Sequence, residues 1–149
     1  MLKQVQKVCE MNPDSSLAQD VLIRSYLAKQ QDGEAIEVAQ KERQFNGHDV
    51  YAFDYVALTY AAAGQRSKAE ALLPQLRAQA EGSQAGGHSL AIAQVYAALG
   101  EKDQAFAWLQ KDFQMRDGGL TLINVLPVLN SLHSDPRFED LVHRIGLPQ

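Results

Sequence analysis

The sequence predicts an all-α protein built from repeated helical hairpins. The first observation is a tyrosine followed nine residues later by an alanine, a pair that occurs three times at an almost constant interval. The three pairs are Tyr26 with Ala35, Tyr60 with Ala69, and Tyr96 with Ala105. The second observation is a helical period of apolar residues around each pair, and the third is a glycine at two of the predicted helix ends. Self-similarity at this interval is typical of repeat architectures.

Residues 1–13 are expected to form one helix, the second helix of an incomplete preceding repeat. Counting back by one period places Met1 at the position of the recurrent alanine. Because a natural solenoid end carries a polar cap, we expect the chain to be a piece of a longer protein. We also expect self-association, or coverage by a swapped helix, through an apolar stripe of Leu2, Val5, Val8 and Cys9.

Residues 16–47 form the first complete repeat in this interpretation. Ser16 and Gln19 fit a capping box at the start of its first helix. Ile23 stands where the other repeats have a small residue, and Gln30 stands where they have glycine. We therefore expect this hairpin to be the least regular of the three.

Residues 50–83 and 86–117 form the second and third repeats. Gly64 and Gly100 are predicted to end their first helices in the left-handed conformation. Pro74 falls inside the second helix of residues 50–83, where it removes a backbone hydrogen bond. A kink near Glu70–Pro74 is therefore expected.

Residues 118–149 are predicted to form a short helical cap. Leu120–Asn124 is expected to be a short helix, and Leu126–Asn130 to be extended or a turn. A final helix should follow, capped by Ser134 or Asp135 and ended by Gly146.

The repeat pattern resembles the tetratricopeptide repeat (TPR) family, whose unit is a helix–turn–helix of about 34 residues. The strings from Tyr60 to Gln65 and from Tyr96 to Glu101 show the agreement between copies. The resemblance covers most of residues 1–117. It implies a TPR-type α-solenoid, a right-handed superhelix of hairpins with the C-terminal segment as its cap.

Residues 88–147 resemble the terminal region of a group of bacterial regulators. The string Asp135-Pro136-Arg137-Phe138 carries part of this resemblance, although His133 stands where the group usually has arginine. The group carries TPR arrays behind a winged-helix, serine/threonine kinase or adenylate cyclase domain. The resemblance implies a non-catalytic protein–protein interaction module in a larger bacterial regulatory protein.

Composition and charge narrow the class of partner. The chain has 14 Lys and Arg against 18 Asp and Glu, a formal net charge of −4, so no nucleic-acid partner is expected for this segment. The longest apolar runs are far shorter than the roughly 20 residues that a membrane-spanning helix needs, and no membrane contact is expected. With one cysteine and no signal-peptide core, the sequence indicates a soluble cytoplasmic protein.

The sequence holds no motif for catalysis or for ligand chemistry. Neither a phosphate-binding glycine loop nor a nucleophile elbow occurs. The four histidines are isolated from one another, and His88 is expected to be a solvated surface group. We therefore expect no enzyme activity, no catalytic residue, no metal site and no cofactor.

The TPR resemblance implies a concave groove lined by the first helix of each repeat. Matching positions gives the candidate binding residues Asp20, Arg24, Tyr51, Asp54, Leu58, Leu90 and Gln94. Some TPR proteins bind acidic peptide C-termini through Lys, Asn and Arg side chains. Two carboxylates at these sites would repel such a terminus. We therefore expect a groove of mixed polar and apolar character that binds a protein or peptide partner. Leu58 and Leu90 either line this groove or pack between helices.

Two other functions remain open at this point. The chain could be a small-molecule sensor that controls an upstream winged-helix, kinase or cyclase domain, although open hairpins rarely supply the closed apolar pocket that a sensor needs. An enzyme is the least favoured of these functions, because the sequence has no catalytic motif.

Overall fold

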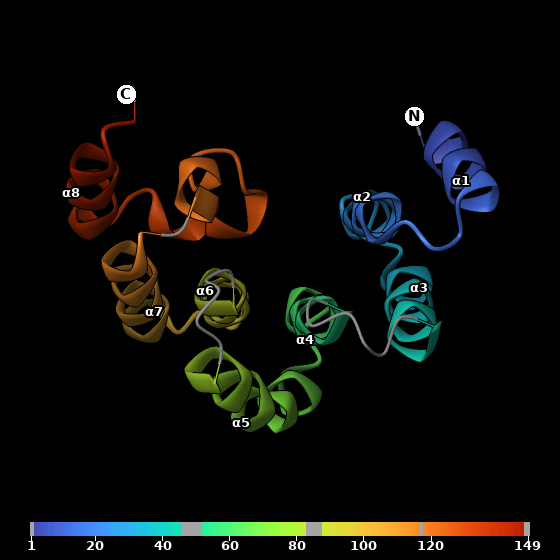
Figure 1. Ribbon diagram of the computed structural model, residues 1–149, viewed down its shortest axis with the longest axis horizontal. Coiled ribbons are helices and arrows are strands. Elements are labelled where there is room, and N and C mark those ends of the chain that lie inside the picture. The colour runs from blue at the N-terminus through green and yellow to red at the C-terminus, as the bar shows by residue number, and fades with distance from the viewer. Residues whose placement is uncertain (1, 46–51, 83–87, 117, 148–149) are drawn as a thin grey trace. The chain divides into compact units, whose positions relative to one another are not determined.

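The computed structural model describes residues 2–45, 52–82, 88–116 and 118–147. Within these ranges the chain is all-α, with eight α-helices, two 3₁₀ helices and no strand. The chain divides into two compact units, residues 1–70 (unit 1) and residues 71–149 (unit 2). Figure 1 shows the helices in chain order, and the boundary between the units falls inside α5 (Arg66–Gly82).

Unit 1 contains α1 (Leu2–Met11), α2 (Ser16–Leu27), α3 (Asp32–Phe45), α4 (Ala52–Ala62) and the start of α5. Each of the first three helices packs against the next one along the chain, and α2 also contacts α4. Ser15 rather than the predicted Ser16 caps α2, because the Ala18 backbone N–H donates to the Ser15 Oγ at 3.3 Å. The prediction therefore placed the N-cap one residue too late in the sequence.

The first helix docks within the chain. Cys9 of α1 is buried together with Ala18 and Leu22 of α2. Leu2 and Val5 pack against the same cluster, whereas Val8 remains exposed. Three members of the stripe predicted for self-association therefore already have partners inside unit 1.

The three hairpin turns share one backbone geometry. The N–H of Gln31, Gln65 and Glu101 donates to the carbonyl of Tyr26, Tyr60 and Tyr96 respectively, at 2.9 to 3.0 Å. Gly64 and Gly100 have φ of +73° and +79°, as predicted, and Gln30 adopts the same region at +58°. The prediction that the first hairpin would be the least regular is wrong at its turn. The short connection imposes a left-handed residue there whether or not glycine is available.

The recurrent tyrosines link each hairpin to the helix before it. The Gln6 amide of α1 donates to the Tyr26 hydroxyl at 2.8 Å, and the Gln40 amide of α3 donates to the Tyr60 hydroxyl at 2.7 Å. Arg77 of α5 bonds the Tyr96 hydroxyl in the same way. Gln6 and Gln40 are separated by the same interval as Tyr26 and Tyr60, which is one period. This supports the prediction that α1 holds the place of a second helix.

Unit 2 contains the rest of α5, then α6 (His88–Ala98), α7 (Lys102–Met115), the 3₁₀ helices η1 (Gly118–Leu122) and η2 (Pro127–Leu132), and α8 (Pro136–Ile145). The α6 and α7 helices pack on each other, η2 packs on α6, and η1 and α8 pack on α7. Pro74 lies inside α5 as expected, and the kink near it stays a prediction.

Of the two conformations predicted for Leu126–Asn130, extended or a turn, the extended one is wrong, because the 3₁₀ helix η2 begins at Pro127. The fixed φ of proline suits the first residue of a helix. Leu129 and Leu132, three residues apart, fall on one side of a 3₁₀ helix, and both are buried. The final helix is as predicted, with Asp135 as its N-cap and Gly146 left-handed at its end.

The last helix continues the phase of the repeats. The α3, α5, α7 and α8 helices begin at residues 32, 66, 102 and 136, so the spacing of second helices persists into the cap. The Arg137 Nη1 donates to the Asp103 Oδ1 at 2.8 Å, and the Arg144 Nη1 donates to the Gln110 Oε1 at 3.0 Å. Helices thus begin at nearly equal intervals through residues 118–147, with η1 and η2 preceding the last of them.

Candidate functional site

Asp20 and Arg24 are the predicted groove residues that the structure brings together. They lie one turn apart on α2, and the Arg24 Nε is 2.9 Å from both carboxylate oxygens of Asp20. Their side chains are 16% and 34% exposed, so the pair remains accessible to a ligand. Because each charge already has a partner, the pair presents a polar patch with no net charge, and not a free cation.

The other predicted groove residues within the described ranges are buried or half-buried. Asp54 on α4 is buried and Leu58, one turn later, is half-buried. Leu90 and Gln94 lie one turn apart on α6, and both are buried. Tyr51 lies outside the described residues. For Leu90, the burial favours packing between helices over groove contact.

An exposed apolar groove lies between α1 and α2, and Val5 and Val8 of the apolar stripe predicted from the sequence are part of its lining. A hollow of about 330 Å³ is lined by Gln4, Val5, Val8, Ser15, Leu17, Ala18 and Val21. We call this hollow the α1/α2 groove. Val8, Leu17 and Val21 are 49%, 75% and 41% exposed. The available signal was a run of apolar residues around α2 too wide for one buried face.

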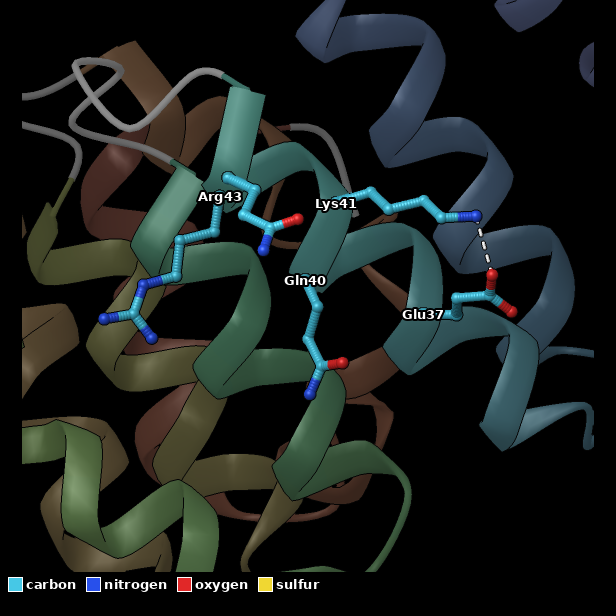
Figure 2. A pocket seen from close by; sticks show the side chains of 5 residues that line it. Glu37, Gln40, Lys41 and Arg43 are labelled. Carbon is cyan, nitrogen blue, oxygen red and sulfur yellow. Dashed lines mark hydrogen bonds and ion pairs between the residues drawn. The ribbon is translucent and has the colours of Figure 1, made fainter.

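A second hollow, of about 520 Å³, lies on the outer surface of α3 (Figure 2). Its lining comes from one helix, and Figure 2 shows the Lys41 ammonium directed at Glu37, with 2.6 Å between Nζ and Oε1. This hydrogen bond lowers the pKa of Glu37. Arg43 lies over the Phe53 ring at 4.8 Å, and Gln40 bonds Tyr60. These polar groups are engaged with their own neighbours, as on an ordinary solvated helix face.

Burial shifts the pKa of His88 and of Cys9. His88, the first residue of α6, is buried, and burial lowers its pKa. The expectation that His88 would be a solvated group is therefore wrong, because the start of α6 is packed inside unit 2. Burial, with a smaller contribution from Glu42, raises the pKa of the Cys9 thiol. That thiol is protonated at neutral pH and is a poor nucleophile there.

The described part of the chain contains no cluster of three or more His, Cys, Asp or Glu side chains that could hold a metal ion. Among the helices described, none is long and apolar enough to cross a membrane. Comparison of the chain with protein-family models, curated proteins and solved structures finds no match.

Proposed function

We propose that the chain is a non-catalytic protein–protein interaction module, a TPR-type α-solenoid that belongs to a larger bacterial regulatory protein. The observation that carries this proposal is the recurrent bond to the tyrosine hydroxyl. Gln6 of α1, Gln40 of α3 and Arg77 of α5 each bond the hydroxyl of the recurrent tyrosine that follows along the chain. A bond that recurs with the sequence period is expected where like units stack on one another.

Stacked hairpins present the first helix of each unit at regular intervals, and extended surfaces of this kind are suited to peptides and proteins. The Asp20–Arg24 pair on α2 is the best candidate for a polar contact on that surface. Because the Arg24 guanidinium is already paired, the proposed ligand is a mixed polar and apolar segment and not a free anionic terminus.

Selection from a random peptide library displayed on phage would test this proposal. The affinity of a recovered peptide should fall about ten-fold or more for Arg24→Ala, since truncating one member of the pair leaves Asp20 uncompensated. Lys41→Ala, which removes an exposed charge from the outer face of α3, is the matched control and should leave the affinity unchanged.

The sensor alternative gives a different result in a second assay. A metabolite library screened by thermal unfolding should produce no stabilised sample if the chain is an interaction module. A metabolite that raises the melting temperature in proportion to its concentration, in the absence of any selected peptide, would favour sensing and contradict the interaction module.

A further inference from the structure

We propose that residues 118–134, which we call the η1–η2 segment, form an interface with a second copy of this chain. This surface belongs to unit 2 and shares no residue with the Asp20–Arg24 pair, so the proposal does not depend on the function proposed above. It also differs from the self-association predicted through the apolar stripe of α1, most of which packs inside unit 1.

The η1–η2 segment has no carboxylate, lysine or arginine side chain, although much of it is exposed. These residue types make up 21% of the chain. The α6 helix also has none of them, but nearly all of α6 is buried. Burial does not explain the η1–η2 segment, since Thr121, Asn124 and Pro127 are exposed. Depletion of charge distinguishes the core of an interface from the rest of a protein surface.

One side of the η1–η2 segment is apolar and exposed. Residues three apart lie on the same side of a 3₁₀ helix. Leu120 and Ile123 are buried, whereas Leu122 and Val125 are 51% and 69% exposed. The Val125 backbone N–H donates to the Leu122 carbonyl at 2.9 Å, so the interval of three continues through the turn after η1. The buried side holds the segment in unit 2, and Leu122 and Val125 remain available for an external contact.

The exposed polar groups of the segment suit an identical partner. In a symmetric dimer the same patch of both copies forms the interface, so a residue near the axis meets its own counterpart. Hydroxyl and carboxamide groups both donate and accept hydrogen bonds and can pair with themselves, whereas an ammonium only donates and a carboxylate only accepts. The segment exposes four residues of the self-pairing kind: Asn124, Asn130, Ser131 and Ser134.

The charge of the whole chain favours the same surface. Each copy has a formal net charge of −4, so two copies repel each other at long range. The α8 helix, which follows the segment in the chain, exposes Arg137, Glu139 and Asp140, as is usual for a solvated helix face. Contact through the η1–η2 segment places no like charges opposite each other. A charged partner, in contrast, would find no opposite charge there to complement its own.

Sedimentation equilibrium of the purified full chain, between about 10 µM and 1 mM protein, tests this proposal. We expect a dimer whose dissociation constant rises about ten-fold or more for Leu122→Asp, because this change buries a charge opposite its own copy. Leu17→Asp is the matched control, since it makes the same exchange at a residue of α2 that is 75% exposed. It should leave the dissociation constant unchanged. Both variants should keep the circular dichroism spectrum of the unchanged chain, because both side chains are exposed.

A second variant separates dimerisation from folding. Val125 lies in the turn between the two 3₁₀ helices, and Val125→Asp should also weaken the dimer about ten-fold or more. A monomer throughout the concentration range would overturn the proposal, and so would a dimer that neither Leu122→Asp nor Val125→Asp weakens. A dimer weakened by Leu17→Asp alone would place the interface at the α1/α2 groove and would equally overturn it.

Discussion

Gln30 occupies a backbone conformation that favours glycine, and we expect Gln30→Gly to stabilise unit 1. Its φ is +58°, close to the values at Gly64 and Gly100 in the equivalent turns. A left-handed residue other than glycine costs about 1–2 kcal/mol. Glycine loses about 0.5–1 kcal/mol more backbone entropy on folding. The difference predicts that the free energy of unfolding rises by about 0.5–1 kcal/mol.

The reverse exchange in the next hairpin is the matched control. A Cβ at Gly64 would meet no heavy atom within 4 Å, so Gly64→Gln tests the backbone without a steric clash. It should lower the free energy of unfolding by about the same 0.5–1 kcal/mol. Urea unfolding followed by circular dichroism should shift in midpoint by about 0.3–0.5 M, upward for Gln30→Gly and downward for Gly64→Gln. A neutral or destabilising Gln30→Gly beside a destabilising Gly64→Gln would refute the reasoning.

Three further predictions concern other contacts. In a double-mutant cycle, Gln6→Ala and Tyr26→Phe should show a coupling of about 1 kcal/mol, since their 2.8 Å bond is partly buried; additive effects would contradict this. Hydrogen bonds from Arg137 lower the pKa of Asp135 from 3.8 to about 2, so the stability that the carboxylate contributes is present above pH 3.8 and lost as pH falls towards 2. Urea titrations between pH 2 and 5 should show this dependence diminished in Asp135→Asn. The buried Cys9 thiol should react with iodoacetamide at least about ten-fold more slowly in the native chain than in urea, and equal rates would argue against its burial.

The turns of the fold were predictable where glycine marks them. Gly64 and Gly100 were expected to end a helix in the left-handed conformation, and both do; Gly146 was expected to end the last helix, and it does so with a left-handed φ as well. A glutamine gives no such signal in the sequence. The left-handed conformation of Gln30 is imposed by the packing of the hairpin and not by the residue's own preference, so it could not be predicted. The period places Gln6 at the position of Gln40, and both bond a tyrosine hydroxyl, while the assignment of α1 as a second helix stays a prediction.

The candidate site was harder to predict because burial depends on distant neighbours. The period of α2 shows which residues are apolar, but it does not show which of them another helix covers. Leu17 and Val21 therefore look like core residues in sequence, although both are exposed. Conversely, Leu90 and Gln94 were placed on a binding surface although they are buried, because a helix face read from sequence errs by a residue or two.

In unit 1, α1, α2 and α3 each pack against the next helix in the chain, and α2 also contacts α4. Such short-range packing lets one end give way while the remainder keeps its structure. A stretching force applied to the first residues should detach α1 before it disrupts α3. Unit 1 should therefore unfold in small successive steps.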